Sequence, residues 1–145
     1  MKFKLLGSFI LLTIFSFTLI ACVESPNVEN QNGEQQDYDQ FSHIDNYSEL
    51  DTYDATGDMY LVYFYLPQCP ACQDLFDDIE DFYHDHSDEY PMVFSYQTAG
   101  TPPANVSHVP SILVMQDGEV LDGPIVGPSS IRDLFTELTS GEYTP

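Results

Sequence analysis

The chain is constrained most by an unbroken apolar and aromatic run that ends at a pair of cysteines. Residues Met59 to Leu66 read Met-Tyr-Leu-Val-Tyr-Phe-Tyr-Leu. They lack the alternation of apolar and polar residues that is typical of a strand with one solvent-exposed face. Such a run predicts a central strand buried on both faces, which favours a layered α/β fold. Pro67 lacks the backbone N–H that a central strand needs and ends the run, and Cys69-Pro70-Ala71-Cys72 follows.

The cysteine pair opens an amphipathic helix. Pro70 suits the first helical position, where no backbone N–H is required. From Cys72 to Tyr83, apolar residues recur at helical spacing and form one stripe, while acidic residues occupy the opposite face. We predict a single helix from about Pro70 to His86, with the cysteine pair at its start.

The rest of the chain contains shorter signals. Asp117-Gly118 indicates a hairpin, and Asn46 is placed to cap a short helix. Ser130 and Asp133 have the spacing of a capping box at the start of the last helix. Residues 97–108 are predicted to be mostly loop. The predicted strands are Phe41 to Ile44, Met92 to Tyr96, Ser111 to Gln116 and Glu119 to Val126, and the further helices are Tyr47 to Tyr53 and Ser130 to Thr139.

Composition excludes one class of partner. The 145 residues include 24 Asp and Glu against 3 Lys and Arg, a net charge of -21. Phosphate backbones are bound by clustered Lys and Arg, so this chain does not bind nucleic acid unaided. Its 43% hydrophobic and 14% aromatic residues are too many for an acidic disordered chain. One domain with a packed core is expected.

The N-terminus has the pattern of an export signal. Met1 to Lys4 is basic, and Leu5 to Ile20 is apolar but short and interrupted, which favours a signal peptide over a membrane span. It ends in Leu19-Ile20-Ala21-Cys22, which resembles the bacterial lipobox. The resemblance implies a diacylglycerol on Cys22, on the extracytoplasmic side of a bacterial cell membrane. A plain secretory signal and a retained membrane anchor are the alternatives.

The expected organisation therefore has three parts. Residues 1–21 form the signal peptide, and residues 22–40 form a flexible polar and acidic tether without periodic apolar positions. Residues 41–145 form one domain. We expect the protein to be a monomer.

The cysteine count points to reactivity. With a lipid on Cys22, the odd count of three leaves Cys69 and Cys72 as a pair. A disulfide across so short a loop adds little stability. A helix N-terminus stabilises a thiolate, the reacting species of disulfide exchange, so we predict Cys69 as nucleophile and Cys72 as resolving thiol. A redox-silent disulfide and a zinc site are the alternatives, but His84 and His86 lie too far along the helix to complete four ligands. We expect no metal, and no cofactor besides the Cys69–Cys72 disulfide.

In this context the sequence resembles the thioredoxin superfamily over about residues 41–140. The resemblance implies an α/β thioredoxin-like fold, a central mixed sheet flanked by helices in the order β-α-β-α-β-β-α. It implies that Pro110 is the family's cis-proline and that Val109 offers its backbone to an extended peptide, with Pro70 also at the substrate-binding surface. The matching features are the strand before the cysteine pair, the amphipathic helix, Val109-Pro110 before an apolar strand, the Asp-Gly hairpin and Gly127 before the last helix.

The resemblance also implies a function. It implies a thiol–disulfide oxidoreductase that acts on the cysteines of exported proteins. A reductase would need a membrane electron donor and an oxidase a membrane electron acceptor, and the sequence leaves open which of the two it is. Two departures stand out: Gln68 replaces the Trp that cytosolic thioredoxins carry before the first cysteine, and Tyr63 replaces their buried Asp. The alternative is a non-enzymatic thioredoxin-fold accessory lipoprotein, for example one that binds a secreted peptide.

Overall fold

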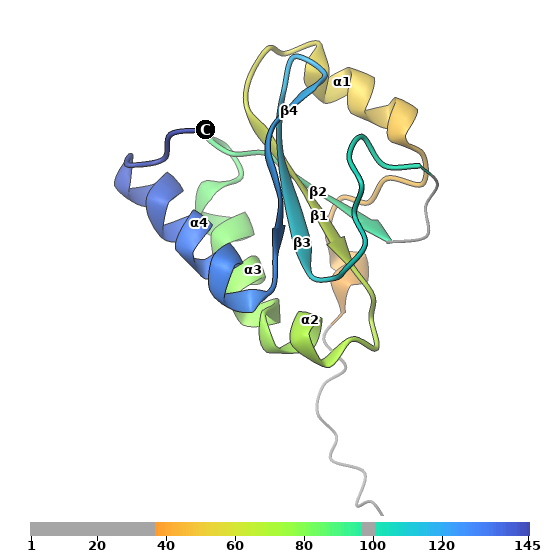
Figure 1. Ribbon diagram of the computed structural model, residues 1–145, viewed down its shortest axis with the longest axis vertical. Coiled ribbons are helices and arrows are strands. Elements are labelled where there is room, and N and C mark those ends of the chain that lie inside the picture. The colour runs from red at the N-terminus through yellow and green to blue at the C-terminus, as the bar shows by residue number, and fades with distance from the viewer. Residues whose placement is uncertain (1–36, 97–100) are drawn as a thin grey trace, which may run out of the picture. The chain divides into compact units, whose positions relative to one another are not determined.

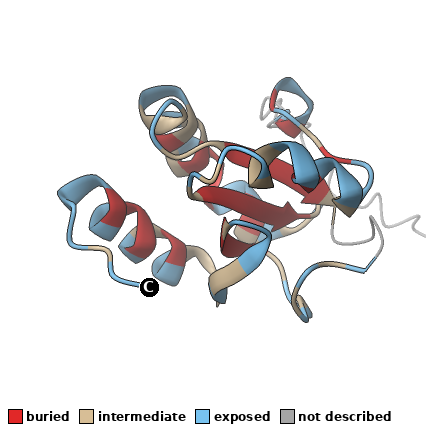
Figure 2. Ribbon diagram, turned by 90° about the horizontal axis from the view of Figure 1, so that it is seen from above, coloured by how far each residue is buried: buried red, intermediate tan, exposed pale blue. Residues whose placement is uncertain are grey.

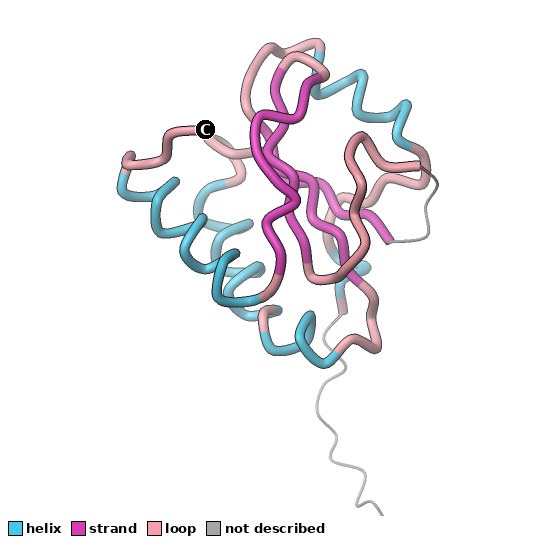
Figure 3. The backbone as a smooth tube through the Cα atoms, in the orientation of Figure 1, coloured by secondary structure: helices cyan, strands magenta, loops and turns pink. Residues whose placement is uncertain are grey.

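The computed structural model describes residues 37–96 and 101–145. Four strands form one mixed sheet in the spatial order β2-β1-β3-β4, and helices lie on both of its faces (Figures 1 and 3). The strands are β1 (Tyr60–Tyr65), β2 (Met92–Tyr96), β3 (Ser111–Gln116) and β4 (Glu119–Val126), the α-helices are α1 (Asp51–Asp54), α2 (Pro70–Asp74), α3 (Phe76–His86) and α4 (Pro128–Ser140), and the 3-10 helices are η1 (Tyr38–Gln40) and η2 (Tyr47–Leu50).

β1 is the central strand that the apolar run predicts. It pairs in parallel with β2 and antiparallel with β3, so that Tyr63 lies between Phe94 and Ile112. All six of its residues are buried. The strands predicted at 92–96, 111–116 and 119–126 have the observed bounds. No helix within residues 37–96 and 101–145 is long and apolar enough to cross a membrane.

The two faces of β1 belong to two separate cores. Figure 2 shows the buried strands at the centre of the fold. Leu61, Tyr63 and Tyr65 pack with the inner faces of α2, α3 and α4 and with η1. Tyr60, Val62 and Phe64 pack with η2 and with partly buried residues of the segment 101–108. Alternation along the strand thus divides its six side chains between two layers, which explains why every one of them is aliphatic or aromatic.

The helix predicted from Pro70 to His86 is broken at Leu75. Leu75 has φ -94° and ψ -7° and ends α2 while α3 begins at the next residue. Its N–H bonds to the Cys72 carbonyl three residues back, at 3.2 Å. The carbonyls of Cys72 and Asp74 also accept hydrogen bonds from side chains elsewhere in the chain, Tyr38 and Arg132. Insertion of such side chains into a helical ladder is a physical cause of a kink.

The start of the domain differs from the prediction. Phe41 to Ile44 forms no strand, and His43 makes only an isolated parallel bridge with Phe94 of β2. Residues 38–40, assigned to the tether, form η1, and Tyr38 is only 3% exposed. The packed part of the chain therefore begins before residue 41. The rest of the predicted tether and the signal peptide lie outside the described residues.

Local capping signals were correct in one place and wrong in another. Asn46 caps η2 as predicted, in a capping box with Glu49, although the predicted helix over 47–53 is split into η2 and α1. The last helix begins at Pro128 and not at Ser130, because Pro128 itself suits the first helical turn. Ser130 therefore lies inside α4, and its predicted capping box with Asp133 is wrong.

The remaining turn and loop predictions agree with the structure. Asp117 and Gly118 join β3 to β4 with φ values of +51° and +78°, the left-handed pair of a two-residue hairpin turn. Residues 101–108 contain neither helix nor strand, and residues 97–100 lie outside the described part. The mixed sheet flanked by helices is the predicted fold class, although its element order does not begin with a strand.

We predict that Gly123→Ala in β4 lowers the free energy of unfolding by about 3 kcal/mol. Gly123 has φ +111°, and a Cβ there would lie 2.7 Å from the Ile112 carbonyl oxygen. Gly141→Ala is the matched control, because Gly141 has φ +73° but nothing within 4 Å. This control should lose only about 1 kcal/mol in urea unfolding. Equal losses at the two positions would contradict the close approach at Gly123.

Candidate active site

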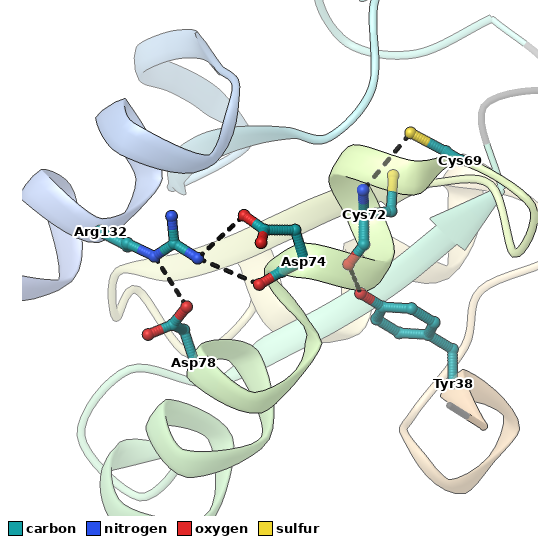
Figure 4. A network of polar contacts seen from close by, with 6 residues as sticks. All are labelled: Tyr38, Cys69, Cys72, Asp74, Asp78 and Arg132. Atoms are coloured by element: carbon teal, nitrogen blue, oxygen red, sulfur yellow. Dashed lines mark hydrogen bonds and ion pairs between the residues drawn. The ribbon is translucent and has the colours of Figure 1, made fainter. Parts of the chain in front are cut away.

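Cys69 lies at the start of α2, just beyond the end of β1. It is the N-cap residue, with extended backbone angles, and its Sγ accepts a hydrogen bond from the Cys72 N–H at 3.4 Å (Figure 4). Its side chain is half-buried. The free N–H groups of a helix N-terminus favour a thiolate at this position. The placement is the one the sequence predicts, and the nucleophilic role stays a prediction.

Cys72 lies in the first turn of α2 with its side chain fully buried. Both cysteines are free thiols in this structure. Burial raises the pKa of the Cys72 thiol to about 12, although a hydrogen bond with the Leu66 backbone opposes part of that rise. Of the two thiols, Cys69 is therefore the one that solvent can reach.

The structure brings the predicted peptide-binding residues to the cysteine pair. The Val109–Pro110 peptide bond is cis, and the Cys69 thiol donates to the Val109 carbonyl oxygen at 3.8 Å. Pro110 is buried, whereas Pro70 is exposed in the first turn of α2. Cys22, the predicted lipidation site, lies outside the described residues.

Solved structures of thioredoxins are similar to this one. Mitochondrial thioredoxin 3 from Saccharomyces cerevisiae, in its oxidised form, matches with a TM-score of 0.58 and 17% identity, over 69% of this chain and 97% of that chain. Thioredoxin from Trypanosoma brucei brucei matches with a TM-score of 0.59 and 12% identity, over 69% and 88%. The protein has a thioredoxin-like fold. No family model and no curated protein matches the chain, and at these identities the likeness establishes the fold alone.

Two tyrosine hydroxyls form the floor of the site in this thioredoxin-like fold. Tyr63 of β1 is fully buried, and its hydroxyl lies 3.2 Å from that of Tyr38 in η1. The Tyr38 hydroxyl donates to the Cys72 carbonyl oxygen at 2.7 Å (Figure 4). Burial raises the pKa of both tyrosines far above the ordinary value, so both hydroxyls are protonated at neutral pH.

Sequence reasoning noted Tyr63 but missed Tyr38. Tyr38 lies between Asp37 and Asp39, inside the predicted tether. A lone aromatic residue in a polar stretch was the available signal. Its partner Cys72 lies 34 residues away, so no local pattern could have connected them.

Arg132 of α4 was also missed. Its Nε donates to Asp78 Oδ2 at 2.8 Å, and its guanidinium contacts Asp74 Oδ2 at 3.2 Å and donates to the Asp74 carbonyl at 3.0 Å. Arg132 is the only Lys or Arg after Lys4. It offsets the negative charge of Asp74 at the end of α2 and of Asp78 in α3, which would oppose a thiolate at the start of α2, and it joins α4 to both helices.

Other polar groups lie apart from the cysteine pair. An open cavity of about 310 Å³ lies between α3 and α4, and its lining includes Asp81, Asp85 and His86 but neither cysteine. Within residues 37–96 and 101–145, no group of three or more His, Cys, Asp or Glu side chains is arranged to hold a metal ion.

The buried Cys72 thiol should make the reduced protein less stable in alkali. Above about pH 9, the unfolded chain releases this proton while the folded protein, with a pKa of about 12, retains it. The stability that burial of the neutral thiol contributes is complete below pH 9 and is lost as pH rises toward 12, by about 1.4 kcal/mol per pH unit.

Urea unfolding of the reduced parent and of Cys72→Ala, from pH 8 to pH 10.5, measures this loss. Ionising tyrosines affect both proteins equally, so the stability advantage of the parent over Cys72→Ala should narrow steadily above pH 9. A difference that stays constant over that range would show that Cys72 titrates alike in the folded and unfolded states.

Proposed function

We propose that the protein is a thiol–disulfide oxidoreductase that acts on the cysteines of exported proteins. The observation that carries this proposal is the arrangement of the two thiols at the start of α2. Cys69 is accessible at a helix N-terminus, and Cys72 is buried behind it. Attack by the first thiol and resolution by the second require this order of access.

The exchange proceeds in two steps in the reducing direction. The Cys69 thiolate attacks one sulfur of a substrate disulfide, whose S–S bond breaks as a mixed disulfide forms. Cys72 then loses its proton and attacks the Cys69 sulfur. The Cys69–Cys72 disulfide forms, and the second substrate sulfur leaves and is protonated. Two electrons pass from the cysteine pair to the substrate, and the reverse sequence oxidises a substrate dithiol.

The substrate surface would surround Cys69. The Val109 carbonyl lies beside the Cys69 thiol, and the exposed Pro70 borders it on the helix side. An extended peptide that pairs with the Val109 backbone would place its own sulfur against Cys69. Recognition through the backbone suits exported clients of varied sequence.

The proposal also places the protein at a membrane. A lipid on Cys22 would hold it on the extracytoplasmic face of a bacterial cell membrane, where disulfides persist. A membrane electron donor would then recycle a reductase, and a membrane acceptor would recycle an oxidase. Incorporation of labelled fatty acid into the parent, and its loss in Cys22→Ser, tests this part separately.

The reduction potential of the pair tests the redox function. We expect the Cys22→Ser chain, whose only thiols are Cys69 and Cys72, to show one two-electron transition in glutathione and dithiothreitol buffers. A potential near roughly -270 mV would identify a reductase, and one of roughly -120 to -180 mV an oxidase or isomerase. A pair that does not cycle would contradict the enzyme proposal in favour of an accessory binding lipoprotein.

Client capture provides the matched test in cells. Cys72→Ser should accumulate mixed disulfides between Cys69 and exported proteins, because the resolving thiol is absent. Cys69→Ser, which retains the buried thiol only, is the control and should capture none. Equal capture by both variants would show that the assigned order of the two cysteines is wrong.

A further inference from the structure

The resolving step raises a problem of charge. Cys72 must become a thiolate as it attacks Cys69, yet it is fully buried. In the described part of the chain, the buried polar side chains other than tyrosine and cysteine are Ser95 and Ser111, so no buried carboxylate or cation is available. The hydrogen bond with the Leu66 backbone supplies part of the stabilisation that a thiolate needs there. A thiolate formed in such a place remains costly unless a second hydrogen-bond donor turns toward it.

The hydroxyl hydrogens beneath Cys72 can be assigned by counting donors. Tyr38 has one hydroxyl hydrogen, and it goes to the Cys72 carbonyl oxygen at 2.7 Å, because a carbonyl can only accept. The 3.2 Å contact between the two tyrosines must then use the hydrogen of Tyr63. In the dithiol state, the Tyr63 hydrogen is therefore directed at the Tyr38 oxygen and not at the Cys72 sulfur.

We propose that the Tyr63 hydroxyl is a switchable donor, whose hydrogen turns from the Tyr38 oxygen to the Cys72 sulfur as that sulfur becomes a thiolate. The proposal rests on the thiol exchange proposed above and assigns a role to the floor of the site. The turn exchanges a long neutral hydrogen bond for a charge-assisted one, which is about twice as strong. Tyr38 meanwhile keeps its bond to the Cys72 carbonyl and holds α2 above Tyr63.

The hydroxyl donates a hydrogen bond and transfers no proton. The Cys72 proton passes to the leaving substrate sulfur, so that a Cys69–substrate disulfide and the Cys72 thiol become the Cys69–Cys72 disulfide and a substrate thiol. The Cys69–substrate S–S bond breaks, the intramolecular one forms, and two electrons go to the substrate. The Tyr63 hydrogen then returns to Tyr38, because a disulfide sulfur carries no charge.

The surroundings of Cys72 are consistent with a neutral donor. Besides burial, the groups that act on its thiol are the Leu66 backbone, Cys69 at the start of its own helix, and Tyr63 of β1, whose hydroxyl is a hydrogen-bond partner of the thiol. Tyr38 hydrogen-bonds the Cys72 carbonyl, and the charges that act on Tyr38 are those of Cys72, Cys69 and Asp77. Burial raises the pKa of both tyrosines, so they remain donors throughout the pH range in which exchange is measured.

A two-phase reaction separates the roles of the two cysteines. The reduced Cys22→Ser chain is mixed with 5,5′-dithiobis(2-nitrobenzoate), and release of the yellow thiolate is followed by stopped flow. The first equivalent reports attack by Cys69, and the second reports resolution by Cys72. We expect Tyr63→Phe to slow the second phase about tenfold, and to move its pH midpoint upward, while the first phase stays within about twofold of the parent.

Two further variants distinguish donation from packing. Tyr60→Phe removes a buried hydroxyl from the opposite face of the same strand, where it binds Asp54, and should leave both phases unchanged. Tyr38→Phe removes the competing acceptor and should quicken the second phase by about two- to tenfold, because the Tyr63 hydrogen then has Cys72 as its partner.

The outcomes separate this inference from the proposed function. An unchanged second phase and pH midpoint in Tyr63→Phe would overturn the donor role. Slowing of both phases alike, or slowing in Tyr38→Phe as well, would assign the tyrosines a packing role and also overturn it. Release of only one equivalent by the parent would instead overturn the exchange function on which the inference rests.

Discussion

The burial of β1 on both faces is the constraint on which the rest of the structure depends. A strand with six buried residues must be covered by two layers, and alternation along it divides its side chains between two cores. The same burial determines what lies beneath the cysteines. Because the Tyr63 side chain belongs to the core that also contains Cys72, its hydroxyl becomes part of the floor of the site.

At the kink around Leu75, α2 contacts both the tyrosine floor, through Tyr38, and the exposed ion pairs of Arg132. In a continuous helix the carbonyls of Cys72 and Asp74 would accept from the backbone four residues on, but here they accept from the side chains of Tyr38 and Arg132, and Cys72 also accepts from the Leu75 N–H three residues on. One of these side chains comes from the start of the domain and the other from its last helix. The start of α2, which carries both cysteines, is thus positioned by both ends of the fold.

What the sequence predicted well was determined locally. The central strand, the apolar stripe through Cys72 and the Asp117-Gly118 turn are periodic or two-residue signals. The kink, the role of Tyr38 and the ion pairs of Arg132 depend on contacts across 34 to 58 residues, which one sequence does not reveal. The capping box at Ser130 failed for another reason, because Pro128 is a competing start signal two residues earlier.

The charge balance of the chain explains why hydroxyls suit the floor of this site. With 24 acids and 3 basic residues in the sequence, a buried carboxylate beneath Cys72 would add to a strongly negative field. Its pairing would require a cation, and the guanidinium of Arg132, the only Lys or Arg after Lys4, already binds Asp74 and Asp78. An unpaired buried carboxylate is also costly in itself. A tyrosine hydroxyl can donate a hydrogen bond to a transient thiolate without adding a permanent charge. In so acidic a chain, a neutral donor therefore suits this buried position better than a carboxylate.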